Sequence, residues 1–295
     1  MLHNFAQFKN IGQWLEYWAE HTPDKVAFHF LGERDGEVSS VSFSQLQDRA
    51  QTVAAALLQS AQPGERAVLT YHPGIEFFVA FLGCIQAGLV AVPVYPPTSP
   101  KHWPRFVKIV LNCEASVICT TENLAQPSRA GIATSPELAQ IKLLETDGLS
   151  TPAQGSGQGS GQGSGQGSGQ GSGQGSGQGS GQGYVACTAD RDTIAFLQYT
   201  SGSTGDPKGV ILTHGNVYHN ECLITEAMQC DAHSVAVCWL PQYHDMGLIG
   251  NLLGSLFNGV TAVLMSPLSF LKSPYRWLKA ISDYRATHSG GPNFA

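Results

Sequence analysis

The chain of 295 residues carries 16 Lys and Arg against 22 Asp and Glu, a net charge of −6, and 42% of its residues are apolar. This composition excludes an intrinsically disordered protein outside residues 155–183, which repeat the sequence GSGQ. No stretch concentrates basic residues, which argues against nucleic acid or an anionic membrane as the main partner and favours a small-molecule site.

The first predicted elements are a helix, a hairpin and a second helix. Apolar spacing predicts a helix over residues 11–21 and strands over residues 26–31 and up to Phe43, with the turn at Asp35-Gly36. Ser42 and Gln45 form a capping box for a helix that extends to Leu58. Helical spacing also predicts core positions for three tryptophans: Trp14, Trp18 and Trp277.

The alternation of strands and helices then continues. Strands are predicted over residues 67–71, 89–94 and 115–120, with helices over residues 75–87 and 104–111. Residues 77–94 contain Gln86, two glycines and Pro93, so they predict a helix followed by a buried strand and no membrane span. Strands resume over residues 193–199, 234–239 and 260–265. This order predicts a parallel α/β fold.

The GSGQ tract, residues 155–183, interrupts that pattern. Glycine at every second position cannot bury apolar surface, so the tract is expected to be a flexible and dispensable insertion. A domain boundary is the alternative, but the α/β alternation after it favours one domain interrupted by a loop.

The cysteines and the N-terminus predict a cytoplasmic protein. The seven cysteines are odd in number and lack a C-x-x-C pair, as expected of thiols buried in a reducing compartment. The N-terminus has no basic segment followed by a continuous apolar one, so a secretory signal is not predicted.

Residues 197–216, LQYTSGSTGDPKGVILTHGN, concentrate the chemistry of the chain. Residues 200–209 hold three glycines, four hydroxyl side chains and Lys208. Glycines let backbone N–H groups approach oxyanions and Lys208 adds positive charge, so the loop predicts a polyphosphate site. Neither the Walker A order nor the glycine-flanked serine of a hydrolase elbow is present. A solvated Ser/Gly hairpin is the alternative interpretation.

The segment YTSGSTGDPKGV, residues 199–210, resembles the signature loop of the adenylate-forming superfamily. VPVYPPTSP at residues 92–100, WLPQYHDMGLIG at 239–250 and SGGPNFA at 289–295 are most similar to fatty acyl-AMP ligases. The resemblance implies an α/β fold of layered β-sheets flanked by helices. It also implies that residues 1–295 are an incomplete N-terminal adenylation domain without the small C-terminal domain.

An intact protein of this family is expected to bind ATP and Mg²⁺ and to join a fatty acid to AMP. The acyl group would then pass to the thiol of an acyl carrier protein, including one in a polyketide synthase, with coenzyme A as the alternative acceptor. The resemblance assigns the ATP phosphates to Thr200, Ser201, Gly202, Ser203, Thr204, Gly205 and Lys208. It places His244 near the reacting carboxylate, and it assigns the wall of the acyl and adenylate pocket to Gly291, Pro292 and Asn293.

Several interpretations stay open at this stage. Asp245 is at least as well explained as the N-cap of a helix over residues 246–257 as by a ligand contact. His214 is expected to shape the turn after the loop. The chain stops inside a recognisable segment, so the 295 residues alone are expected to make no acyl-adenylate. A non-catalytic nucleotide-binding or interaction module is the alternative function.

Overall fold

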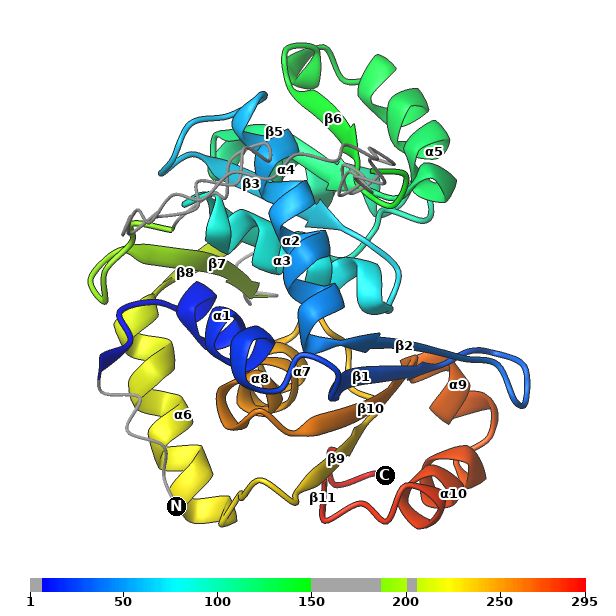
Figure 1. The fold of residues 1–295 in the computed structure, drawn as a ribbon. Coiled ribbons are helices and arrows are strands. Elements are labelled where there is room, and N and C mark those ends of the chain that lie inside the picture. The colour runs from blue at the N-terminus through cyan, green and yellow to red at the C-terminus, as the bar shows by residue number, and fades with distance from the viewer. Residues whose placement is uncertain (1–6, 150–186, 201–205) are drawn as a thin grey trace, which may run out of the picture.

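The computed structural model describes residues 7–149, 187–200 and 206–295, which form two β-sheets and their helices (Figure 1). The GSGQ tract lies outside the described residues. The predicted phosphate ligands Ser201 to Gly205 lie outside them as well.

The first sheet has the strand order β11-β9-β10-β1-β2. Its strands are β1 (Val26–Leu31), β2 (Val38–Ser42), β9 (Val235–Cys238), β10 (Thr261–Met265) and β11 (His288–Ser289). Strands β1 and β2 are antiparallel, with Leu31 opposite Val38, and Gly36 has a φ of 82° in the connection between them. The predicted hairpin is therefore confirmed. Strands β11, β9, β10 and β1 run parallel to one another.

The second sheet has the order β6-β5-β3-β4-β7-β8. Its strands are β3 (Arg66–Thr70), β4 (Val90–Val94), β5 (Ala115–Thr120), β6 (Lys142–Glu145), β7 (Ile194–Thr200) and β8 (Lys208–Thr213). All neighbours are parallel except β7 and β8. The predicted parallel pattern is thus incomplete. The strands divide between two sheets, and each sheet ends in one antiparallel pair, because the short connections in those pairs cannot form a parallel crossover.

Helices α2 (Phe43–Leu58) and α3 (Ile75–Gln86) lie between the two sheets (Figure 1). Every residue of α3 except Glu76 is buried, as a helix enclosed on all sides requires. The predicted capping box of α2 is confirmed, because the Ser42 N–H donates to Gln45 Oε1 at 3.0 Å and the Gln45 N–H to Ser42 Oγ at 3.3 Å. A Cβ at Gly83 would lie 2.6 Å from Val53 Cγ1, so glycine lets the two helices approach.

The remaining helices flank the sheets. They are α1 (Ile11–His21), α4 (Trp103–Asn112), α5 (Glu122–Ala133), a 3₁₀ turn (Pro136–Leu138), α6 (His214–Met228), α7 (Asp245–Gly247), a π-helical segment (Leu248–Leu253), α8 (Gly254–Asn258), α9 (Pro267–Lys272) and α10 (Tyr275–Asp283). The predicted helix over residues 246–257 is therefore three consecutive helical segments. None of the helices in the described ranges is long and apolar enough to cross a membrane.

Two of the three tryptophans predicted for the core are buried. Trp14 and Trp18 are 1% and 6% exposed, whereas Trp277 is only partly buried. The core prediction for Trp277 is confirmed only in part: its ring packs against Trp239 and Phe270 of the core, while its indole Nε1 donates to Ser289 Oγ at 2.8 Å. All seven cysteines are free thiols. Four of them are buried: Cys84, Cys113, Cys119 and Cys238.

Candidate active site

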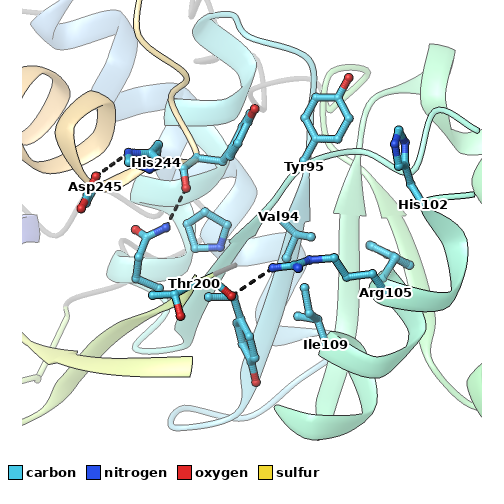
Figure 2. Close-up of a pocket in the computed structure, with 13 residues that line it drawn as sticks. Val94, Tyr95, His102, Arg105, Ile109, Thr200, His244 and Asp245 are labelled. Carbon is cyan, nitrogen blue, oxygen red and sulfur yellow. Dashed lines mark hydrogen bonds and ion pairs between the residues drawn. The ribbon is translucent and has the colours of Figure 1, made fainter. Parts of the chain in front are cut away.

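A cavity of about 360 Å³ opens at the carboxyl ends of β4 and β7, which are neighbouring parallel strands (Figure 2). Ligands of open α/β sheets bind at this edge, where the strands end and the loops begin. Four parts of the chain form its walls. Residues 93–95 are the end of β4 and the residue after it, residues 102–109 belong to α4 and the turn before it, and residues 198–200 end β7. Residues 243–245 come from the loop after β9 of the other sheet.

The predicted phosphate loop begins at this cavity. Thr200 lines it and pairs with Lys208 across the β7–β8 hairpin, so these two residues form the base of the loop. Lys208 is exposed to solvent. The structure therefore brings together the first and last of the predicted phosphate ligands, although the other five, residues 201–205, lie outside the described ranges.

Helix α4 adds two cations that the sequence analysis missed. Arg105 Nη2 donates to the carbonyl oxygen of Thr200 at 3.0 Å, and Lys108 Nζ pairs with Asp206 Oδ1 at 3.0 Å (Figure 2 shows Arg105). The Arg105 contact is at the start of the loop, and the Lys108 contact is near its end. The signal in the sequence was the spacing of Lys101, Arg105 and Lys108, which recurs on one helical face.

His244 lies on the side of the view opposite His102 and Arg105 (Figure 2). Its Nδ1 pairs with the Asp245 carboxylate, and both side chains are more than half exposed. This pairing orients the imidazole and leaves Nε2 for a ligand.

Asp245 is not the N-cap that the sequence predicted. The helix begins at Asp245 itself. The carbonyl oxygen of His244 accepts the first hydrogen bond of this helix, from the Leu248 N–H at 2.8 Å. Asp245 Oδ1 accepts instead from the Met246 N–H at 2.7 Å. His244 therefore has the N-cap position, and the side chain of Asp245 is available to the imidazole.

Two glutamine amides hold the loop that carries His244. Gln198 Nε2 donates to the carbonyl oxygen of Tyr243, and Gln242 Oε1 accepts from the Gly74 N–H, each at 2.7 Å. Gln198 belongs to β7 and Gly74 precedes α3, so both bonds join this loop of the first sheet to the second sheet and its helix layer. Within the described residues, the buried Gln198 Oε1 has no further hydrogen-bond partner. That oxygen belongs to a residue lining the cavity.

The three residues predicted to form the wall of the acyl and adenylate pocket do not line this cavity. Gly291 and Pro292 are partly buried and Asn293 is exposed, and none of these three described residues lines either of the two cavities described here. Gly291 lies against Trp239, because a Cβ at this glycine would be 3.1 Å from the indole Cζ2. Trp239 in turn stacks on Phe270 with 3.9 Å between ring centroids.

The described residues form a second cavity of about 360 Å³. Its lining is mostly apolar and comes from α6, from the helical segments 246–258, from β9 and β11, and from residues next to these strands and to β10. Met246 follows His244 by two residues and lines this cavity together with Gly290. The sequence analysis did not find this cavity, because its walls come from segments far apart in the chain.

Two buried titratable residues lie on α6. His214, the first residue of the helix, accepts from the Ile11 N–H at 3.3 Å, and burial lowers its pKa to about 4. His214 therefore joins the start of α6 to α1, whereas the sequence analysis expected it to shape the turn after the loop. Glu221, seven residues further on, is 0% exposed, and burial raises its pKa to about 8. A glutamate in a helix ordinarily predicts a solvated face, so this burial could not be predicted from the residue type.

The described carboxylates do not fit the expected Mg²⁺. Among the described residues there is no group of three or more His, Cys, Asp and Glu side chains that could hold a metal ion. Asp206 is paired with Lys108, and Asp245 with His244. These two carboxylates therefore each have a cationic or imidazole partner.

The model of a family described as "AMP-binding enzyme" matches residues 15–293. The medium-chain-fatty-acid–[acyl-carrier-protein] ligase JamA of Moorena producens is 35% identical over 293 residues, which cover 98% of this chain and 45% of that protein. The long-chain-fatty-acid–AMP ligase FadD32 of Mycolicibacterium smegmatis is 32% identical, with 99% of this chain and 43% of that protein covered.

Solved structures give the same likeness. The fatty acyl-adenylate ligase of L. pneumophila, in complex with acyl adenylate and pyrophosphate, has 30% identity and a TM-score of 0.81. The match covers 100% of this chain and 46% of that one. The chain thus spans about half the length of the relatives it matches.

Proposed function

The chain belongs to the family of AMP-binding enzymes, and from this membership we propose that the whole protein activates a fatty acid with ATP, forming an acyl-adenylate and pyrophosphate. Its two sheets with helices between and around them have the fold of the N-terminal adenylation domain of fatty acyl-AMP ligases. The relatives are about twice as long as this chain, so the activity is proposed for the whole protein and not for these residues alone.

The proposed reaction brings two anions together. A carboxylate oxygen of the fatty acid attacks the α-phosphorus of ATP, and a new P–O bond forms. The bond between the α-phosphorus and the oxygen bridging to the β-phosphate breaks, and pyrophosphate leaves with that electron pair. Positioning and the stabilisation of negative charge supply most of the catalysis in such reactions.

The main support for this proposal is the set of contacts at the base of the predicted phosphate loop. Thr200 and Lys208 face each other there, and Arg105 and Lys108 contact its two ends at 3.0 Å. A leaving pyrophosphate bound in the loop would meet three positive side chains. His244, on the opposite side of the cavity, would contact the carboxylate or the α-phosphate through Nε2.

The apolar cavity beyond Met246 is the proposed site of the acyl chain. It starts two residues from His244 and is enclosed by α6 and the helical segments 246–258. Each methylene transferred from water into such a cavity contributes about 0.8 kcal/mol. A hydrocarbon chain there would leave its carboxylate near His244.

We propose a carrier-protein thiol as the acyl acceptor. The relatives JamA and TtuA, 35% identical to this chain, are named as ligases of fatty acids to an acyl carrier protein. Coenzyme A is the alternative acceptor. Purified whole protein, preloaded with labelled acyl-adenylate, would be offered the phosphopantetheine form of a carrier protein and coenzyme A in parallel. Transfer to coenzyme A alone would contradict this choice.

The adenylation itself is tested by exchange of labelled pyrophosphate into ATP. The whole protein should form labelled ATP only when a fatty acid is present, because the reverse reaction needs the acyl-adenylate. A series of straight-chain acids covers the range of chain lengths. Absence of exchange with every acid in the series would overturn the proposed function.

The cytoplasm is the proposed location. All seven cysteines are free thiols, as expected in a reducing compartment.

A further inference from the structure

The apolar cavity has one end near His244 and one end far from it. Met246 and Gly290 lie together at the near end, because a Cβ on Gly290 would be 3.8 Å from Met246 Cε. Ser234 and Val260 also line the cavity, and they directly precede β9 and β10. Gly290 directly follows β11, and β9, β10 and β11 run parallel. The cavity therefore runs along the strands, from their carboxyl ends to their amino ends.

The register of the strands gives the length of this cavity. Ser289 is opposite Val237, so the next residue, Gly290, is level with Cys238 at the end of β9, four residues after Ser234. At ~3.3 Å per residue of a strand, the two ends of the cavity are roughly 13 Å apart. An extended hydrocarbon chain advances roughly 1.3 Å per carbon, because its bonds of ~1.5 Å form a zigzag. The cavity is therefore long enough for about ten carbons.

Buried side chains form the far end of the cavity. Ser234 and Val260 are 6% and 4% exposed. Asn258 lines the cavity two residues before Val260, and its Nδ2 donates to Thr225 Oγ1 at 3.0 Å, which joins α8 to α6 at this end. The near end is open by comparison, since Met246 is 48% exposed. An acyl chain would therefore enter beside Met246 and stop at the far end.

Met228 lies between the far end of the cavity and solvent. It is the last residue of α6, and His288 Nε2 donates to its carbonyl oxygen at 2.8 Å. His288 is the first residue of β11, so this contact places Met228 at the amino ends of the strands. Met228 lines the cavity and is also 49% exposed. A side chain that contacts both the cavity and solvent is part of the wall that separates them.

We propose that this protein prefers straight-chain acids of about ten to twelve carbons, counting the carboxyl carbon near His244, and that Met228 sets the upper limit. This inference rests on the proposed function, because it assumes that the apolar cavity holds the acyl chain. Each methylene that fits into the cavity should raise the affinity about fourfold, as the burial of a CH₂ group does. A longer chain gains nothing more, because its end would have to displace side chains that are already packed.

The test measures pyrophosphate exchange by the whole protein with straight-chain acids from hexanoate to octadecanoate. For the wild-type protein, kcat/KM should rise up to decanoate or dodecanoate and should be at least about tenfold lower for octadecanoate. Met228→Ala shortens the side chain at the far end, so the end of a long chain can reach solvent. The ratio of kcat/KM for dodecanoate to that for octadecanoate should then fall toward one. Met228→Trp should shift the preference to shorter acids.

Leu223 provides the matched control, because it is an exposed apolar residue on the same helix that does not line the cavity. Leu223→Ala should leave the ratio unchanged. A wild-type kcat/KM that is equal or higher for octadecanoate would overturn the length limit while leaving fatty acid activation intact. The same ratio in wild type and Met228→Ala would overturn the role of Met228. Absence of exchange with every acid would instead overturn the proposed function, and the inference with it. The wild-type profile decides the length limit even if a variant does not fold.

Discussion

Gln198 Nε2 donates to the carbonyl oxygen of Tyr243 at 2.7 Å, and this bond joins a strand of the second sheet to the loop of the first sheet that carries His244. Gln198 is in β7 of the second sheet, whereas Tyr243 follows β9 of the first. His244 is the next residue, so the position of its imidazole depends on a contact between segments that are 45 residues apart.

The first prediction concerns this bond. Gln198→Leu removes the donor and leaves the Tyr243 carbonyl without it, which should lower the free energy of unfolding by about 1–3 kcal/mol. Pyrophosphate exchange should fall by about tenfold or more, mostly in kcat, because His244 is no longer held in place. Gln62→Leu, at an exposed glutamine, should change neither quantity. An unchanged kcat in Gln198→Leu would show that Gln198 does not position His244 for the reaction.

The second prediction concerns Lys208. Lys208→Ala removes a cation from the base of the phosphate loop, and the loss of transition-state stabilisation should be about 2–4 kcal/mol, by analogy with the removal of a preorganised donor. Exchange by the whole protein should drop accordingly. Lys142→Ala, at an exposed lysine at the start of β6, is the control for a change in net charge. Full exchange activity in Lys208→Ala would exclude this lysine from the mechanism.

The third prediction concerns Gly247 in the segment after His244. A Cβ at this position would lie 2.8 Å from the carbonyl carbon of Pro241 and still closer to its oxygen, so the chain has no room for a side chain. Gly247→Ala should lower the free energy of unfolding by about 1–3 kcal/mol, as overpacking does.

Gly250 provides the comparison for Gly247. It lies one turn further on, and nothing is within 4 Å of its would-be Cβ. Gly250→Ala should keep or raise stability, by up to about 1 kcal/mol, because alanine favours a helix. Urea denaturation of both variants measures the difference, and equal stabilities would contradict the packing argument.

The fourth prediction is a pH dependence caused by Glu221. Its pKa is about 8 in the folded protein and 4.5 in the reference state, so between these values the folded state holds a proton that the unfolded state has lost. Stability should therefore fall as pH rises from 4.5 to 8, by at most about 1.4 kcal/mol per pH unit from this group. Glu221→Gln should be more stable than wild type at pH 8 and should lose this slope. Parallel curves for the two proteins from pH 5 to 8 would contradict a buried neutral carboxyl group.

The fifth prediction has the opposite sign and concerns His214. Burial lowers its pKa to about 4 from 6.5, so between these values the unfolded state binds the proton that the folded state excludes. Stability should decrease as pH falls from 6.5 to 4. Nuclear magnetic resonance titration of the imidazole measures the pKa directly. A value at or above 6.5 would contradict the buried neutral histidine.

Local interactions were readable from the sequence because the atoms that make them are close along the chain. The capping box of Ser42 and Gln45 needs only three residues, and the hairpin of β1 and β2 needs only a turn that includes Gly36. The all-round apolar pattern of α3 predicted its burial without any knowledge of its neighbours. The polyphosphate site at the Gly-rich segment after β7 stays a prediction, because residues 201–205 lie outside the described residues.

The division of the strands into two sheets was decided only by the tertiary structure, because pairing joins segments distant in sequence. Strand β1 pairs with β10, more than 200 residues later, and nothing local to either strand specifies that choice. The same holds at the site. Arg105 reaches the phosphate loop because α4 packs beside β7, and His244 is the N-cap because the turn after β9 is held by Gln198.

The burial of Glu221 shows most clearly what only the tertiary structure determines. Its neighbours along α6 include exposed polar residues, and its sequence context predicts a solvated side chain. The helical segments 246–258 cross α6 at this residue and place Gly254 against the carboxyl group. Burial, and with it the pKa of the group, is a property of the packing of two helices, because desolvation depends on every atom around the group and not on the adjacent residues.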